Sequence, residues 1–149
     1  MSISRISISL FLAFFSLLIF GSLAAQDLGN PIVPVVNHSV SQPFISKNGL
    51  RAIFSMRLRN WPDNNTPITV FVLPDTDPLH NQFSKETLNV FPGQMRRAWN
   101  RLVFSGSGQA PITVANRQEM LERVNSTPGA IGYLPITDIR NDVRILQME

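Results

Sequence analysis

Short β-branched and apolar runs recur along the sequence, separated by stretches whose hydrophobic residues have helical spacing. The clearest run covers residues 68–73 and ends at Pro74, which predicts a buried strand. A similar run at residues 32–37 predicts a first strand, in which Pro34 favours an edge position or an irregular start because proline cannot donate to a sheet ladder. A short apolar segment lies at residues 112–114, and further strands are expected at residues 130–134 and 143–146.

Two short helices are predicted from the residues at their starts. Ser46 can cap the first of them, whose buried face would consist of Leu50, Ile53 and Phe54. Asp77 is placed to cap the second, because Pro78 suits the first turn of a helix. The buried stripe of this second helix is expected to contain Leu79, Phe83 and Val90.

Two further helices have clearer patterns. One covers about residues 93–104, with an apolar face of Met95, Ala98, Trp99, Leu102 and Val103. Its Arg96, Arg97 and Arg101 form a basic face that either meets an acidic partner or is simply solvated. The other helix begins at Asn116, which stands three residues before Glu119 as in a capping box.

Alternating strands and helices predict an α/β fold, with a mostly parallel or mixed sheet flanked by helices. The part of the chain from residue 26 to residue 149 has the size of one domain and can bury a hydrophobic core. The sequence contains no internal repeat that would indicate another architecture.

The first 25 residues have the layout of a secretory signal peptide. Arg5 is the only charge before Asp27, and an apolar core leads to small residues at the exit. We therefore expect cleavage after Ala24 or Ala25, and a periplasmic or secreted protein that meets the membrane only through this segment before cleavage. The alternative is an uncleaved anchor, because residues 6–25 carry no charge and are just long enough to span a bilayer.

Composition excludes several classes of function. The chain contains no cysteine, so it has neither disulfides nor thiol chemistry. Its formal net charge is +3, and loss of Arg5 with the leader would reduce this to about +2. Such a small excess gives no reason to expect a nucleic-acid partner. No motif calls for a cofactor.

Polar residues after the first two strands are the candidates for chemistry. His38 and Ser39 follow the first strand, a usual ligand position in open α/β sheets. Asp75, Asp77 and His80 are residue types that could ligate a metal. The alternative is that Asp77 caps the helix, Asp75 completes a turn and His80 is exposed, and we assign no metal site. No catalytic residue is assigned either, because no nucleophile is paired with a base.

The order of several motifs resembles a known family. These motifs are LRAIF at residues 50–54, a turn from Trp61 to Thr66, Trp99 in a helix, a Phe-x-Gly-x-Gly-x-x-Pro loop at residues 104–111, and Pro-Gly-Ala-Ile-Gly-Tyr at residues 128–133. Over residues 32–146 the chain resembles one lobe of a type II periplasmic binding protein of the phosphate ABC transporter substrate-binding kind.

That resemblance implies a single-lobe domain that binds a ligand and catalyses nothing. The implied ligand is phosphate or another small oxyanion, and the implied partner is an ABC importer. The alternative is a module that kept the fold without ligand binding and contacts another envelope protein. The ligand-binding residues that follow from these positions are Asn37, His38, Ser39, Ser46, Asp75, Thr76 and Asp77.

The sequence departs from the family pattern at the loop that holds the anion. Leu73 stands near the position of the family's arginine, and residues 77–79 replace its Ser-Gly-Thr. Pro78 has no N–H to donate. Asp75 and Asp77 are expected to repel an anion. These departures predict weak phosphate binding at this loop.

Overall fold

The computed structural model describes residues 29–149. The expected leader at residues 1–25, and the alternative of a membrane anchor there, lie outside the described residues. Within residues 29–149 no helix has the length and apolar character needed to cross a membrane.

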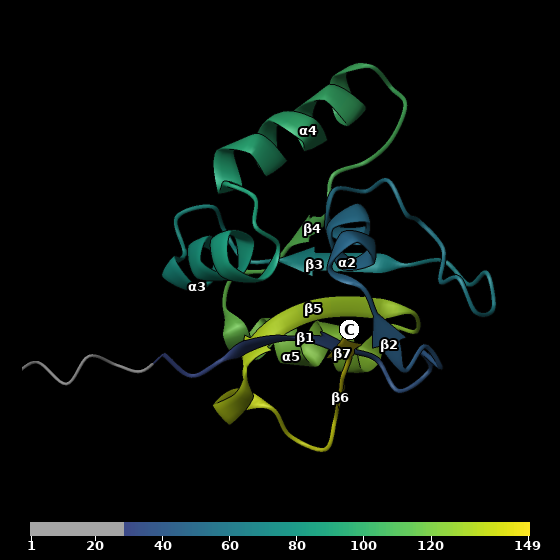
Figure 1. The fold of residues 1–149 in the computed structure, drawn as a ribbon. Coiled ribbons are helices and arrows are strands. Elements are labelled where there is room, and N and C mark those ends of the chain that lie inside the picture. Colours follow the sequence, from purple (N-terminus) through teal and green to yellow (C-terminus); the bar gives the residue numbers. More distant parts are fainter. Residues whose placement is uncertain (1–28) are drawn as a thin grey trace, which may run out of the picture.

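A five-stranded mixed sheet forms the centre of the fold (Figure 1), in agreement with the predicted α/β class. The strands are β1 (Ile32–Val36), β3 (Thr69–Val72), β4 (Ile112–Thr113), β5 (Ala130–Pro135) and β6 (Arg144–Ile145). Their spatial order is β4-β3-β5-β1-β6. β3 is parallel to β4 and β5, whereas β1 is antiparallel to both β5 and β6.

The prediction of an edge position for β1 is wrong. β1 pairs with β5 along its whole length and with β6 at Val35 and Val36. The carbonyl of Pro34 accepts a hydrogen bond from the backbone N–H of Leu146, 3.0 Å away. The missing N–H of Pro34 therefore faces the side covered only by the two-residue β6, where the sheet tolerates its loss.

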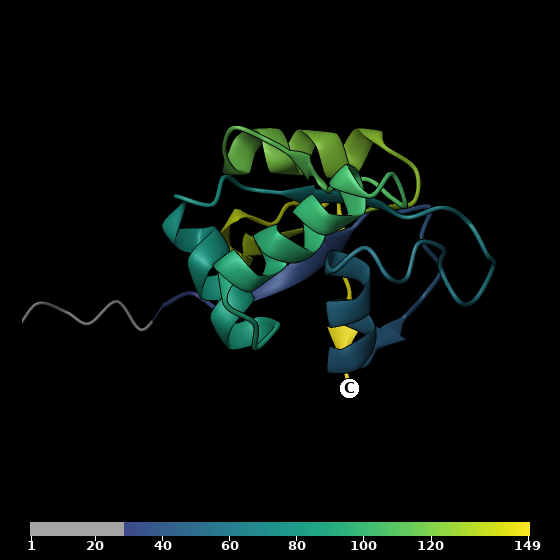
Figure 2. The same ribbon diagram turned by 90° about the horizontal axis from the view of Figure 1, so that it is seen from above.

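Helices lie on both faces of this sheet. They are α2 (Lys47–Phe54), α3 (Pro78–Gln82), α4 (Pro92–Phe104) and α5 (Arg117–Ser126), with a π-helix η1 (Phe83–Thr87) and a 3-10 helix η2 (Ile136–Asp138). α5 covers one face, and α2 and α3 lie on the other (Figure 2). Ser46, Asp77 and Asn116 cap α2, α3 and α5 through their side-chain oxygens, as predicted.

A second, two-stranded sheet was not predicted. It pairs β2 (Phe44–Ile45) in parallel with β7 (Gln147–Met148), close to the C-terminus. Two-residue strands carry too few side chains to show the alternation by which a strand is recognised in a sequence.

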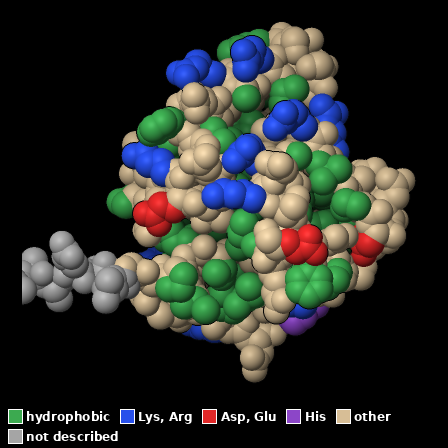
Figure 3. Space-filling view, in the orientation of Figure 1, with side chains coloured by type: hydrophobic (Ala, Val, Ile, Leu, Met, Phe, Trp, Pro, Cys, Tyr) green, Lys and Arg blue, Asp and Glu red, His purple; other side chains and the backbone are tan. Residues whose placement is uncertain are grey.

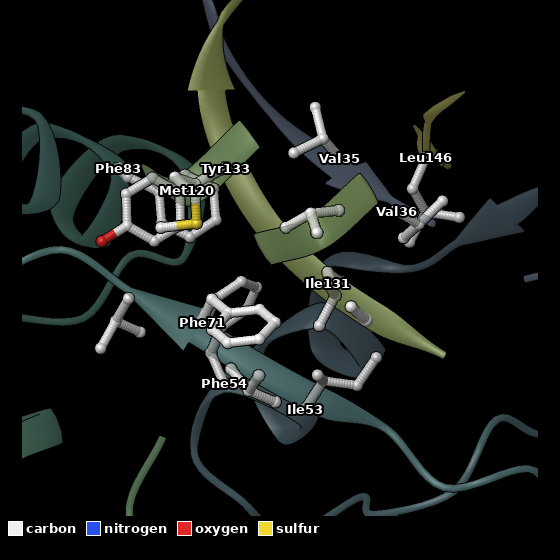
Figure 4. Packing of buried hydrophobic residues seen from close by; sticks show 14 of the residues in the cluster. Val35, Val36, Ile53, Phe54, Phe71, Phe83, Met120, Ile131, Tyr133 and Leu146 are labelled. Atoms are coloured by element: carbon white, nitrogen blue, oxygen red, sulfur yellow. The ribbon is translucent and has the colours of Figure 1, made fainter. Parts of the chain in front are cut away.

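Aromatic side chains fill the core between the sheet and α2, α3 and η1 (Figure 4). The rings of Phe83 and Tyr133 are stacked with centroids 4.1 Å apart, and the ring of Phe54 meets Phe83 edge-on at 5.1 Å. Trp99 and Tyr133 have no exposed surface. The LRAIF motif thus supplies a buried aromatic that joins α2 to β5.

The π-helix changes the buried stripe that was expected after Asp77. In η1 the backbone N–H of Leu88 bonds to the carbonyl of Phe83, so the next inward position is five residues on instead of four. Leu88 is consequently buried, whereas Val90 and Leu79 are only partly covered. The expectation that His80 is exposed is wrong, because its side chain lies inside the core.

α4 is only partly buried against the rest of the domain. Met95 and Trp99 are buried, but Ala98 and Leu102 are only half covered. Val103, which was expected on the buried face, is 49% exposed, and Phe104 is 86% exposed. In Figure 1 α4 lies beyond the β4 edge of the sheet, so the sheet does not cover the apolar residues at its C-terminal end.

Candidate functional site

The residues predicted to bind a ligand fall at two different ends of the sheet. Val36 at the end of β1 and Val70 near the start of β3 both flank Ile131 of β5, because β1 and β3 run in opposite directions. Asn37 therefore lies where β3 begins, and Asp75 lies beyond the point where β3 ends. The two groups of predicted residues therefore lie at opposite ends of β3.

The loop after β1 serves to hold α5 in place. The side-chain amide of Asn37 donates to the carbonyls of Val124 and Asn125, at 2.9 and 2.6 Å. Its carbonyl oxygen accepts from the backbone N–H of Ser39, and the Ser39 hydroxyl accepts from the N–H of Gly129. These polar groups are thus engaged with the domain's own backbone.

The two remaining residues of that group are exposed and also have partners. Nε2 of His38 lies 2.9 Å from the carbonyl oxygen of Asn141. The hydroxyl of Ser46 accepts from the backbone N–H of Gly49 at 3.1 Å, as the N-cap of α2. Ser46 therefore satisfies the first turn of α2 instead of leaving its N–H groups open.

The loop after β3 contains an ion pair that the sequence did not predict. The guanidinium of Arg96 donates to both carboxylate oxygens of Asp75, at 2.8 and 2.7 Å. This bidentate bond lowers the pKa of Asp75 and raises that of Arg96. Arg96, which was expected on a basic face with Arg97 and Arg101, thus offsets the charge that Asp75 was expected to present to an anion.

The other two residues of this loop offer few donors. A carboxylate oxygen of Asp77 accepts from the N–H of Leu79 at 2.8 Å, which closes the start of α3. Thr76 is exposed between the two aspartates. Pro78 has no N–H at the first helical position and the N–H of Leu79 is taken by Asp77, so the start of α3 offers an oxyanion fewer donors than the family pattern would.

A buried chain of polar groups connects this loop to β5. The hydroxyl of Tyr133 accepts from the N–H of Leu73 at 2.9 Å and lies 2.5 Å from Nδ1 of His80. Nε2 of His80 lies 3.8 Å from a carboxylate oxygen of Asp75. Burial raises the pKa of Tyr133, so its hydroxyl stays protonated and donates a hydrogen bond to Nδ1 of His80. The proton of the neutral imidazole is then on Nε2, the nitrogen that faces Asp75.

Burial lowers the pKa of His80, and this predicts a pH dependence of stability. An unfolded histidine binds a proton near pH ~6.5, whereas buried His80 resists protonation. The unfolded state therefore binds more protons as the pH falls below about 6.5, and stability falls with it. The pKa of Asp75 is also lowered, so its protonation reduces the free energy of unfolding only at more acidic pH.

Urea unfolding of residues 26–149 between pH 7.5 and 5 should show this loss. The exchange His80→Gln should make the free energy of unfolding less dependent on pH over this range. His38→Gln is the matched control, since the second histidine is exposed, and it should keep the wild-type slope. An unchanged slope in His80→Gln would contradict this account of His80.

A groove that the sequence did not reveal lies between α2 and α4. It has a volume of about 410 Å³. Its α4 side is formed by Met95, Ala98, Arg101 and Leu102, which follow one face of that helix, and its other side by Arg51, Ser55 and Arg57. The half-covered apolar residues of α4 thus face this groove.

Positive charge dominates the groove. Arg51, Arg57 and Arg101 line it, and no carboxylate does. Within residues 29–149 none of these three arginines forms an ion pair. Figure 3 shows lysine and arginine side chains outnumbering carboxylates on the half of this face that α2 and α4 form. The sequence indicated the apolar and basic faces of α4, with Arg101 among the basic residues, but it did not indicate that Arg51 and Arg57 lie opposite them.

Solved structures of other proteins share this fold. An ABC-type phosphate transport receptor from Vibrio cholerae matches with a TM-score of 0.62 and 17% identity, over 78% of this chain and 45% of that chain. PstS from Borrelia burgdorferi matches with a TM-score of 0.61 and 17% identity, over 79% and 47%. A phosphate ABC transporter substrate-binding protein with bound phosphate from Clostridium perfringens matches with a TM-score of 0.65 and 14% identity, over 78% and 44%.

At these identities the likeness is one of fold, and the chain spans less than half the length of each of these three structures. No curated protein matched the sequence. The family description that matches, over residues 28–145, is that of a PBP superfamily domain. Because this match covers most of the chain, the protein belongs to the PBP (periplasmic binding protein) superfamily, and it has the fold of the phosphate ABC transporter substrate-binding proteins.

Proposed function

We propose that this chain is an exported, non-catalytic binding domain whose ligand is a small molecule with an oxyanion group. One observation carries the proposal, namely the groove between α2 and α4, whose three arginines have no acidic partner among residues 29–149. Arginine binds carboxylate and phosphate groups bidentately. The proposed mature domain is residues 26–149, after cleavage of a signal peptide at residues 1–25.

The polar network at the end of β3 supports a role in binding and not in catalysis. The ring of His80 is buried, with 1% of its surface exposed, and its Nδ1 is held by Tyr133. The carboxylate of Asp75 is held by Arg96. The carboxylate is thus already paired and the imidazole is buried, so neither is presented to a substrate as a general acid or base.

A second candidate is an interaction module that docks on an ABC importer or another envelope protein. The observation that favours it is the exposed apolar end of α4, where Val103 and Phe104 lie uncovered. The short length of the chain relative to the phosphate receptors is consistent with either candidate.

Isothermal titration of residues 26–149 with inorganic phosphate and a set of organic phosphates and carboxylates distinguishes these candidates. We expect saturable 1:1 binding of at least one organic anion. Inorganic phosphate should bind no more tightly than about millimolar, because Pro78 and the cap by Asp77 remove N–H donors from the loop after β3. No binding by any of these anions at millimolar concentration would overturn the proposed function and favour the interaction module.

A further inference from the structure

The α4 side of the groove has an apolar face that the domain leaves half covered. Ala98 and Leu102 stand four residues apart and line the groove next to the buried Met95. Val90, before the start of α4, extends the apolar lining. Residues four apart lie on the same face of a helix, so these side chains form one continuous surface. A ligand that covers them gains the free energy of removing apolar area from water.

Trp99 anchors α4, which forms one wall of the groove, to the rest of the domain. The indole N–H of Trp99 donates to the carbonyl of Phe54 at the end of α2, with a distance of 2.8 Å. Trp99 itself is fully buried. This bond joins α4 directly to the end of α2, next to the groove that the two helices form.

The arginines differ in how far the domain already uses them. Nε of Arg51 donates to the carbonyl of Leu88, and Nε of Arg57 donates to the hydroxyl of Ser55. Both keep guanidinium N–H groups for a ligand, because a guanidinium has five donors. Arg101 forms no ion pair with any carboxylate of residues 29–149. Positive donors and an uncovered apolar surface thus share one groove.

A bare inorganic anion fits this combination poorly. It would leave Ala98 and Leu102 in contact with water, and it would find flexible guanidinium groups instead of a fixed set of backbone N–H donors. An apolar molecule without charge would leave the arginines unpaired beside it. We infer that the groove binds an organic anion, a phosphate ester or carboxylate with an apolar body, whose charged group pairs with Arg57 and Arg101 while its body covers Ala98 and Leu102.

This inference rests on the proposed function and names the ligand class and the place. The probe is n-hexyl phosphate, compared with inorganic phosphate, which has only the charged group, and with n-hexanol, which has only the apolar body. Titration of residues 26–149 should show hexyl phosphate binding at least about tenfold more tightly than either, because each buried methylene adds to the affinity. Equal affinities for hexyl phosphate and inorganic phosphate would overturn the inferred ligand class but leave the proposed function standing.

Variants test whether the ligand binds in the groove between α2 and α4. The double exchange Arg57→Gln with Arg101→Gln should weaken hexyl phosphate binding by about tenfold or more, since it removes hydrogen bonds to a charged group. Ala98→Glu places a carboxylate in the groove and should abolish binding. Arg97→Gln is the matched control, because Arg97 is exposed on the same helix but does not line the groove; it should retain wild-type affinity.

Each variant changes partly or fully exposed side chains, so its melting temperature should stay near that of the wild type, which separates lost binding from lost folding. If hexyl phosphate binds but the double variant binds it equally well, the groove is not the site, although the proposed function stands. If no organic anion binds the wild type, both the inference and the proposed function fail.

Discussion

Replacing Trp99 by alanine should lower the free energy of unfolding by about 3–5 kcal/mol, the range found for truncation of large buried aromatics. Trp99 has no exposed surface and donates from its indole to the carbonyl of Phe54. Its removal leaves a cavity under α4 and a buried carbonyl without its partner. Urea denaturation of residues 26–149 measures the change.

Phe104→Ala is the control for this prediction. Phe104 lies on the same helix and is also a large aromatic, but it is 86% exposed. Its truncation should change stability by no more than about 0.5 kcal/mol. If Trp99→Ala melted like the wild type, α4 would not be packed on α2 as described. The groove described between these two helices would then be wrong as well.

The exchange Gly129→Ala should also be strongly destabilising. Gly129 has a φ of +73°, and holding alanine in this region costs about 1–3 kcal/mol. A Cβ added there would lie 2.4 Å from the backbone oxygen of Pro67. The turn cannot shift freely to relieve this overlap, because the carbonyl of Gly129 accepts from the indole of Trp61 and from the N–H of Thr69.

Gly106 provides a control that separates the two causes. Its φ is +68°, yet a Cβ there would meet nothing within 4 Å. Gly106→Ala should therefore show only the backbone cost of about 1–3 kcal/mol. If Gly129→Ala and Gly106→Ala lowered the free energy of unfolding equally, the contact with Pro67 would be relieved at little cost.

The parts of the fold that local chemistry determines could be predicted from the sequence. Ser46, Asp77 and Asn116 cap their helices because side-chain oxygens satisfy the first-turn N–H groups wherever the chain lies. The runs that became β3 and β5 were recognisable because β-branched and apolar residues fit a buried sheet.

Features that depend on distant partners could not be predicted. The sheet tolerates Pro34 in β1 because the side of β1 that lacks its N–H pairs only with the two-residue β6. Nothing near Pro34 in the sequence indicates this pairing. His80 is buried because the hydroxyl of Tyr133, which is 53 residues away, gives its ring a partner. In the same way, the ion pair between Arg96 and Asp75 spans 21 residues.

The candidate site illustrates the same limit. Polar residues after strands were singled out by a rule about strand ends, and the structure shows most of them bonded to the domain's own backbone. The groove is formed by α2 and α4, two helices that are separated by β3, α3 and η1 in the chain. Only the three-dimensional fold brings Arg57 and Arg101 to one place.

Arg96 makes two of the interactions described above non-additive. Its guanidinium holds Asp75 and also lies over the ring of Trp99, with 4.9 Å between the guanidinium carbon and the ring centroid. The loss in Trp99→Ala will therefore include weakening of the ion pair, because Arg96 loses the surface that orients it. In a double-mutant cycle, Asp75→Asn should cost less stability when Trp99 is already alanine than in the wild type. Asp75 and Trp99 would thus show a coupling energy because each of them contacts the side chain of Arg96.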